Sequence, residues 1–333
     1  GSEVKLTQIN RNTFKGAEQL KISLSGGFEK QVSGQAGRSN SYSLGAEAQL
    51  IFPRFVFPIW NFDSYNAYVP KTHITVGAQL MNRANYYTLL SGKGEFGYIW
   101  KGNQFNEHVF NPISVGYVRT TNTTDSFNRM LERVPTLKRN FENQFIIGSN
   151  YTYTYTNQFQ EYRRNNILFI GSAESAGNTI NLFLPKDEDG KKRLFNTVTN
   201  QFLRLEADFR DYYKLNPGKT TLAGRLNIGY GIPHGNSEIL PYVRQFFAGG
   251  GNDIRAFRAR SLGPGTFNVN SDTMQLFADQ GGDIKFLTSA ELRAKLYRFI
   301  HGAVFLDAGN IWLAKEDSAR PGGRFNFGRA FNE

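Results

Sequence analysis

The sequence predicts an all-β protein, an antiparallel transmembrane β-barrel with one long loop folded into its lumen. Three observations support this class. The chain of 333 residues contains 34 Gly, 29 Phe and 16 Tyr, yet its mean hydropathy is −0.45. Apolar residues are therefore diluted by polar neighbours, as in strands with one face of each kind. The predicted strands are roughly ten to sixteen residues long, well above the usual length of about five or six. No segment approaches the roughly twenty apolar residues of a membrane-spanning helix, which a barrel does not need.

Apolar and polar residues alternate clearly in eleven segments, each of which is a predicted strand. The first two, residues 19–24 and 44–50, form a predicted hairpin around a turn at 34–40. The next two, 73–80 and 87–100, are joined by a short turn at 82–85. The remaining strands are predicted at 109–119, 145–155, 167–173, 203–210, 222–230, 285–297 and 302–312.

Two connecting segments differ from the strand pattern. Between Asn122 and Lys138 the apolar residues Phe127, Met130, Leu131 and Val134 follow a helical spacing, which predicts one or two helical turns. Residues 186–192 carry mixed charge and are expected to form a solvated loop.

The alternation alone is compatible with two architectures. In a soluble β-sandwich the apolar faces point inward, whereas in an outer-membrane barrel they contact lipid and the polar faces line the lumen. Strand length favours the barrel, and so do aromatic residues near strand ends, because aromatic girdles mark the membrane interfaces. These aromatic residues are Phe55, Phe57, Trp60, Phe62, Tyr65, Tyr68, Tyr212 and Tyr213.

Composition argues against several other kinds of protein. The net charge is +11, but acidic and basic residues are interspersed, as in residues 204–210. This pattern favours a solvated surface of mixed charge over a basic patch that binds nucleic acid. The chain has no cysteine, so neither disulfides nor thiolate-bound metal hold the fold. No metal site or cofactor is predicted, because the four histidines, His73, His108, His234 and His301, are scattered. No serine lies in a nucleophile elbow, and an enzyme is not predicted.

One glycine-rich segment stands out. Residues 246–257 read Phe-Phe-Ala-Gly-Gly-Gly-Asn-Asp-Ile-Arg-Ala-Phe, and residues 261–265 read Ser-Leu-Gly-Pro-Gly. The glycines permit backbone conformations that let a loop fold back on itself. They lack the strand-to-helix context of a phosphate-binding loop, so a nucleotide is not predicted.

Two acids on later strands are placed to meet an arginine of this segment. Glu291 and Asp307 lie on the polar faces of neighbouring predicted strands, so both point into the lumen if the aliphatic faces meet lipid. Arg255, carried inward by the loop, could then make a bidentate contact with Asp307, with Glu291 close enough to join. The alternative is an exposed loop arginine with two solvent-facing acids.

Several segments together resemble the outer-membrane insertase superfamily that includes BamA and TamA. Residues 246–257, followed by 262–265, look like its signature loop, which has an aromatic pair, Ala-Gly-Gly and a hydrophobic-Arg-Gly-aromatic tip. Residues 305–312 are similar to the family's penultimate conserved strand, and residues 12–18 resemble the turn before its third strand. Taken with residues 282–285 and 320–323, the best match is to the TamA-like proteins of Bacteroidetes, and it covers essentially the whole chain.

The resemblance assigns roles within a signature loop, residues 232–283, which is expected to fold into the lumen. Its latch is implied to be Arg255 with Asp307 and Glu291. The implied hinge and tip residues are Gly249, Gly250, Ile254, Ala256, Phe257, Gly263 and Pro264. The family usually has glycine after the arginine, so Ala256 would be strained if that position needs a positive φ.

The resemblance also implies an organisation. Residues 1–333 are expected to supply the central eleven strands of a sixteen-stranded barrel, and Gly1-Ser2 is typical of an excised segment or a cloning scar. The first two strands, the last strands and the periplasmic POTRA domains are expected to lie outside this chain.

The function implied by the resemblance is to insert or export client proteins through a lateral gate in the bacterial outer membrane. The implied partners are outer-membrane lipid or lipopolysaccharide, client proteins, and periplasmic proteins or lipoproteins. Two alternatives are a secretion pore of the two-partner type and a soluble carbohydrate-binding β-sandwich.

Overall fold

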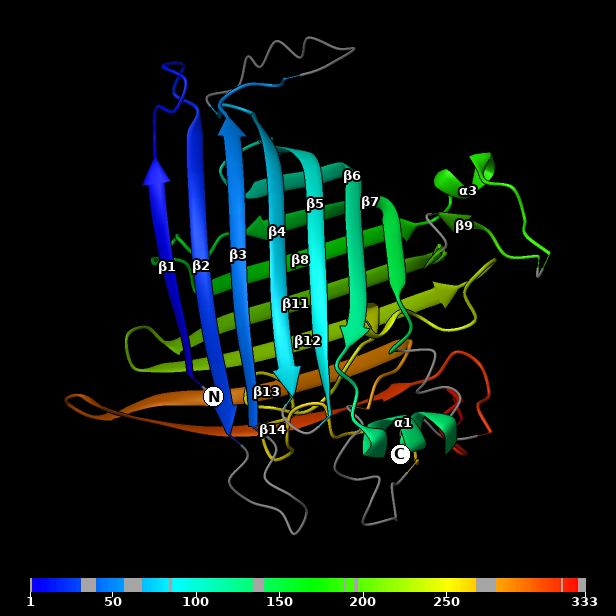
Figure 1. The fold of residues 1–333 in the computed structure, drawn as a ribbon. Helices are drawn as coiled ribbons and strands as arrows, with labels where there is room; N and C mark the ends of the chain where they lie inside the picture. Colours follow the sequence, from blue (N-terminus) through cyan, green and yellow to red (C-terminus); the bar gives the residue numbers. More distant parts are fainter. Residues whose placement is uncertain are drawn as a thin grey trace.

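A computed structural model describes most of the chain as one large antiparallel sheet (Figure 1). The described residues are 2–30, 40–56, 68–83, 86–133, 141–188, 190–194, 197–267, 280–318 and 320–328. Within them, twelve strands pair in the order β1-β2-β3-β4-β5-β6-β7-β8-β11-β12-β13-β14, and β9 and β10 form a separate two-stranded sheet.

The strands vary in length, and the long ones belong to the large sheet. They are β1 (Ser2–Asn10), β2 (Gln19–Lys30), β3 (Asn40–Phe52), β4 (Lys71–Arg83), β5 (Tyr87–Lys101), β6 (Asn106–Thr121), β7 (Gln144–Thr156), β8 (Asn165–Ala176), β9 (Arg193–Leu194), β10 (Thr197–Val198), β11 (Phe202–Asn216), β12 (Thr220–Pro233), β13 (Ile284–Tyr297) and β14 (Ile300–Trp312). The helices are α1 (Asp125–Arg133), α3 (Ile180–Phe183) and a 3-10 turn at Tyr242–Arg244. No helix within the described ranges has the length and apolarity needed to cross a membrane.

All eleven strands expected from the sequence are present. The two expected pairs, 19–24 with 44–50 and 73–80 with 87–100, are neighbours in the sheet as β2–β3 and β4–β5. The count of eleven is wrong, because β1 adds a twelfth strand to the sheet. Val4 and Leu6 begin an alternation in β1, but Gln8 occupies the next outward position and Ile9 follows it, so the apolar pattern is too short to detect. The predicted helical turns are α1, whereas α3 is only four residues long and was not predicted.

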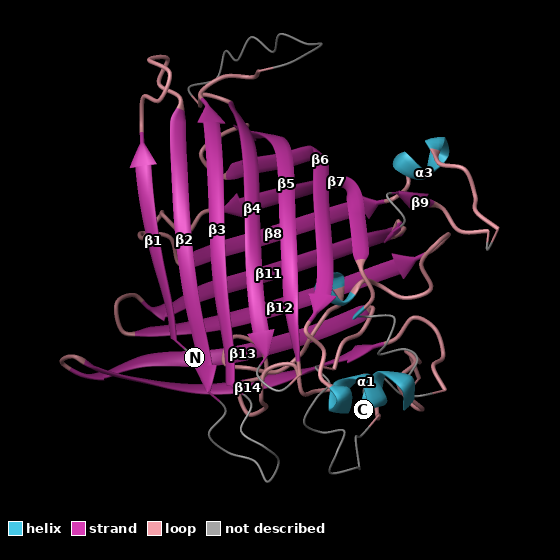
Figure 2. Cartoon of the chain, viewed as in Figure 1, coloured by secondary structure: helices cyan, strands magenta, loops and turns pink. Residues whose placement is uncertain are grey.

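The sheet curls so that β1 to β7 lie in front of the remaining strands, which cross behind them (Figure 2). Its two ends differ. The longer connections, 122–143, 177–201 and 234–283, leave from one end, named here the loop end. The connections at the opposite end, named the turn end, are 11–18, 53–70, 102–105, 157–164, 217–219 and 298–299, and all except 53–70 have eight residues or fewer.

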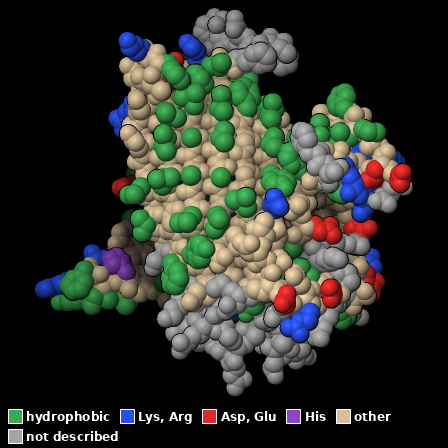
Figure 3. All heavy atoms as spheres, viewed as in Figure 1, with side chains coloured by type: hydrophobic (Ala, Val, Ile, Leu, Met, Phe, Trp, Pro, Cys, Tyr) green, Lys and Arg blue, Asp and Glu red, His purple; other side chains and the backbone are tan. Residues whose placement is uncertain are grey.

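Apolar side chains form rows on the outer face of the sheet, as Figure 3 shows over β1 to β6. Val76 is 61% exposed and Leu306 is 74% exposed. Polar side chains between such residues are buried on the inner face, with Thr75 at 3% and Asn227 at 1% exposure. A soluble sandwich would bury the aliphatic rows between two layers, so this distribution supports the barrel and contradicts the sandwich.

A hydrophobic core fills the loop end. One cluster joins β5 and β6 to α1 through Tyr87, Leu89, Val118, Phe127 and Phe141. Two others contain residues of the 234–283 connection, and their members are Ile146, Ala176, Phe202 and Leu240 in one and Phe246, Ala248 and Ile311 in the other. The described parts of the 122–143 and 234–283 connections are therefore packed against the sheet at this end.

The predicted aromatic girdle is described only in part. Phe57, Trp60, Phe62 and Tyr65 lie outside the described residues. Phe55 packs edge-on against Tyr98, with ring centroids 5.5 Å apart.

Candidate functional site

The base of the signature loop lies against the inner face of β11 and β12. Phe246 and Gly282 exchange two backbone hydrogen bonds of 2.9 Å, which close the base. The Phe246 ring packs over Gly229, where a Cβ atom would lie only 2.3 Å from Cε1 of the ring. The guanidinium carbon of Arg204 also lies 4.2 Å from the centroid of this ring. These contacts bury Phe246 and direct the rest of the loop along the interior.

The loop reverses direction at its glycines. Gly249 and Gly250 have φ values of 97° and 104°, which L-residues with a Cβ rarely adopt. The Gly250 amide donates to the Phe257 carbonyl at 2.9 Å and closes the return. A Cβ at Gly249 would lie 2.3 Å from the Arg258 carbonyl oxygen, so this position requires glycine.

The tip residues divide into one buried and two exposed positions. Ile254 is 5% exposed, whereas Ala256 is exposed and Phe257 is 52% exposed. Ala256 is not among the described non-glycine residues with positive φ. The alanine therefore fits the tip without the backbone strain that a positive φ would have caused at this position.

Arg255 lies between the two acids that the sequence singled out. Its Nε donates to Oδ2 of Asp307 and its Nη2 donates to Oδ1, each at 2.8 Å, which is a bidentate contact. Its Nη1 donates to Oε2 of Glu291 at 2.5 Å, and its backbone amide donates to Asp307 at 3.2 Å. The Asp307 side chain is only 5% exposed. Arg255, Glu291 and Asp307 are called the arginine cluster below.

Strand register explains why these groups meet. In the β13–β14 pair, Ser289 is opposite Asp307 and Glu291 is opposite Phe305, so the two acids are diagonal neighbours on one face. The Arg255 guanidinium also lies 3.6 Å from the centroid of the Phe305 ring. Hydrogen bonding to Asp307 and then to Glu291 raises the pKa of Arg255 above its ordinary value, so the cation persists over the physiological pH range.

A second anchor lies two residues before Arg255. Asp253 accepts hydrogen bonds from Nζ of Lys285 at 2.8 and 3.0 Å. Nη1 of Arg225 donates to the Asn252 carbonyl at 2.6 Å, while its Nε and Nη2 contact Asp208. The sequence analysis missed this anchor. The available signal was that Lys285 and Glu291 are six residues apart on one strand and therefore share a face.

Loss of this second anchor has a predictable cost. We expect Lys285→Met to lower the free energy of unfolding by about 2 kcal/mol. The change leaves the mostly buried Asp253 carboxylate with Arg225, whose Nη1 is 3.9 Å away, in place of the closer lysine. The measurement is thermal unfolding in detergent, followed by heat-modifiability on gels. Lys93→Met is the control, since the Lys93–Glu47 pair is about half exposed and is expected to matter by less than about 1 kcal/mol. Equal melting of both variants would contradict the anchoring role.

The part of the loop that follows the tip, residues 263–265, contacts β14. Gly263 precedes Pro264 through a cis peptide bond and has a φ of 79°. A Cβ at Gly263 would lie 2.6 Å from both Asn310 Oδ1 and Ile311 Cγ1. The Gly265 amide donates to the Ile311 carbonyl at 2.7 Å, and Asn310 Nδ2 donates to the Gly265 carbonyl at 3.1 Å.

Asp283 is a buried acid at the end of the loop. Its carboxylate accepts a hydrogen bond from the Ala314 amide at 3.0 Å, and the residue is 3% exposed. Burial raises the pKa of Asp283 above its ordinary value. The folded protein thus retains a proton that the unfolded chain has already released, so stability falls as pH rises from the ordinary pKa through the raised one. We expect Asp283→Asn to remove that part of the pH dependence, as measured by urea unfolding from micelles between about pH 4 and pH 7. An unchanged slope would contradict it.

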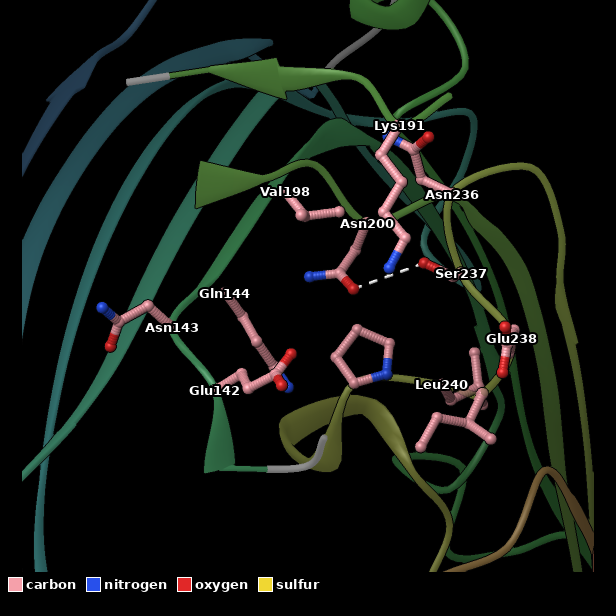
Figure 4. Close-up of a pocket in the computed structure, with 12 residues that line it drawn as sticks. Glu142, Asn143, Gln144, Lys191, Val198, Asn200, Asn236, Ser237, Glu238 and Leu240 are labelled. Atoms are coloured by element: carbon pink, nitrogen blue, oxygen red, sulfur yellow. Dashed lines mark hydrogen bonds between the residues drawn. The ribbon is translucent and has the colours of Figure 1, made fainter. Parts of the chain in front are cut away.

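A polar cavity lies beside the start of the loop (Figure 4). Its volume is about 150 Å³, and its lining includes Gln144, Lys191, Asn200 and Ser237. Ser237 Oγ and Asn200 Oδ1 are 3.3 Å apart, joining the 177–201 connection to the signature loop. Among the residues that the structure describes, no group of three or more His, Cys, Asp or Glu side chains could hold a metal ion.

An antiparallel sheet with apolar outer rows, and a loop held on its inner face by an arginine, defines an outer-membrane β-barrel. The family model for the Omp85 superfamily domain matches residues 12–328, and the chain belongs to the Omp85 superfamily. It is therefore a protein of the bacterial outer membrane.

One relative by sequence agrees with this assignment, and one solved structure shows a similar fold. Over 112 residues, or 31% of this chain, the sequence is 30% identical to the outer membrane protein assembly factor BamA of Neisseria meningitidis serogroup B (strain ATCC BAA-335 / MC58). The fold is similar to the crystal structure of BamA from Haemophilus ducreyi lacking POTRA domains 1–3, with a TM-score of 0.59 and 15% identity over 94% of this chain. The matched parts are 13% of the first relative and 55% of the second, so the chain corresponds to only part of each.

Proposed function

We propose that this chain is the barrel of a protein that helps insert or export client proteins at the outer membrane. Membership of the Omp85 superfamily supports the proposal, and so does the printed name of the relative, an outer membrane protein assembly factor. The observation that carries it is the arginine cluster, in which Arg255 of the loop contacts both Glu291 and Asp307. No step in this role requires a reactive side chain or a cofactor.

The proposed mechanism is energetic. A strand entering the bilayer must satisfy its backbone N–H and C=O groups, because the hydrocarbon offers no partners. A weakly paired seam lets the incoming strand exchange water for backbone partners of the barrel, and that seam is the lateral gate of the proposal. Within the described sheet, β1 and β14 each pair on one side only. The signature loop, which we place in the lumen, braces the wall while the seam exchanges partners.

The orientation and partners extend the proposal. Because outer-membrane barrels have short periplasmic turns and longer outer loops, the loop end is assigned to the cell exterior. The partners are client proteins, outer-membrane lipid or lipopolysaccharide, and periplasmic proteins or lipoproteins. Within the superfamily, the resemblance of residues 246–257 and 305–312 points to the TamA-like proteins of Bacteroidetes.

The test is client assembly by the full-length protein. Arg255→Ala is expected to slow folding of a client barrel in proteoliposomes by about tenfold, which corresponds to about 1.4 kcal/mol. Membrane targeting should be unchanged, and Arg293→Ala should assemble clients normally, because Arg293 contacts Glu291 from an exposed position. Normal assembly by Arg255→Ala would contradict the proposal. A stable, wide open channel in wild-type planar-bilayer recordings would instead favour a secretion pore.

A further inference from the structure

An apolar groove lies on the lipid-facing side of the wall, away from the signature loop. Its volume is about 390 Å³ and its lining is almost wholly apolar. The floor comes from β8 and β11, where Gly171, Ala173 and Ala207 lie beside Leu205. Because these residues share register with outward Tyr151 and Leu205, the groove opens towards lipid and not into the lumen.

Rigid side chains form the two walls of the groove. On β7, the Tyr151 hydroxyl lies 2.7 Å from His108 Nδ1, and the Tyr153 hydroxyl donates to Asn106 Oδ1 at 3.2 Å. Both tyrosines are thus held by β6, and their rings stand beside the floor. Ile228 and Tyr230 of β12 form the opposite wall.

An aromatic ring borders the floor of the groove on one side. The Phe169 ring leans over Gly171, where a Cβ would lie 3.2 Å from the ring carbons. Phe169 lies on the turn-end side of the floor, because β8 runs from the turn end to the loop end. Ala173 is three residues from the end of β8 at Ala176, a distance of about 10 Å along the strand. On β7, however, Tyr153 is three residues from Thr156 at the turn end, so the groove lies near the middle of the wall.

The width of the groove limits the size of the ligand that it can hold. Three strand spacings of about 4.8 Å separate β7 from β12, so the two wall strands are about 14 Å apart. Side chains project from both and narrow this gap. A transmembrane helix has a diameter of about 10–12 Å and does not fit between them. A single hydrocarbon chain does.

We propose that this groove binds one acyl chain of a membrane lipid as a retained, structural lipid. The outer-membrane location supplies this ligand, and the groove offers one chain apolar contacts from its floor and from both walls. Strands added next to β1 or β14 would not cover the site, because β7, β8, β11 and β12 are interior strands of the sheet. The inference depends on membrane location and not on the insertase role, so failure of either leaves the other intact.

The experiment is native mass spectrometry of the full-length protein released from micelles that contain phosphatidylglycerol. Wild type is expected to retain one lipid at collision energies that remove all others. Ala173→Leu/Ala207→Leu fills the floor and should lower the retained fraction by about tenfold, since burial of roughly two methylenes is lost. The matched control is Ala46→Leu/Ala78→Leu, which makes the same changes at paired outward positions of β3 and β4.

The outcomes separate the occupants. Equal retention by the groove variant and the control would overturn the proposal, as would a peptide adduct in place of the lipid. Folding of each variant is checked by heat-modifiability. If the double variant does not fold, Ala207→Leu alone is measured, and it should still retain about threefold less lipid than wild type. Retention equal to wild type in that single variant would also overturn the proposal.

Discussion

Arg255→Ala is expected to destabilise the protein more than any other single loss of charge in the loop. The change removes the bidentate contact with Asp307 and the hydrogen bond to Glu291 together. It leaves two carboxylates close to one another, with side-chain exposures of 5% and 15%. Breaking a buried ion pair from one side typically costs about 3–5 kcal/mol, and the 27% exposure of Arg255 reduces the expected loss to about 3 kcal/mol.

The measurement is the midpoint of thermal unfolding in detergent, and Arg293→Ala is its matched control. Arg293 also donates to Glu291, at 2.7 Å, but its side chain is 53% exposed. Its removal is expected to cost less than about 1 kcal/mol. If the two arginine variants unfold at the same temperature, the arginine cluster does not hold the loop. Arg255→Lys should recover only part of the loss, because an ammonium cannot make the bidentate contact.

Gly249→Ala is expected to have an effect of similar size through the backbone alone. The added Cβ would lie 2.3 Å from the Arg258 carbonyl oxygen, and the φ of 97° is unfavourable for alanine. Backbone strain of this kind costs about 1–3 kcal/mol, to which the steric clash adds. The loop return must then open, and Arg255 leaves Asp307, so the variant should unfold about as easily as Arg255→Ala.

Gly251→Ala separates backbone strain from a general loss of glycine. A Cβ at Gly251 would have no heavy atom within 4 Å, and its φ is not positive. This neighbouring substitution is expected to be neutral within about 0.5 kcal/mol. Limited proteolysis gives a second readout, since the opened loop of Gly249→Ala should be cleaved near Arg258 while Gly251→Ala resists. Equal cleavage of both variants would contradict the requirement for glycine.

Strand content was predictable because lipid and lumen impose a period of two on every long strand. The alternations at 73–80 and 222–230 fall within β4 and β12. β1 was missed because Gln8 occupies the third outward position, where a polar side chain hides the pattern. Helix α3 was missed because four residues are too few to establish a helical period.

The site was predictable only where strand parity and loop chemistry coincided. Parity placed Glu291 and Asp307 on one face, and the glycines marked where a loop could return. The contact between Asp253 and Lys285 depends on how far the loop travels along the wall, which spacing does not specify. The contact of Arg225 with Asn252 could not be predicted either. The arginine donates to a backbone carbonyl, which every residue type has.

The loop contacts three consecutive strands, through Arg225 on β12, Lys285 and Glu291 on β13, and Asp307 on β14. Sliding any one of these strands past its neighbour would break several charged contacts at once. These three of the twelve strands of the sheet are therefore expected to move as one rigid unit. Opening motions of the barrel should then have their hinges at the borders of this unit. Spin labels on β12 and β14 should keep a constant separation while the barrel opens and closes.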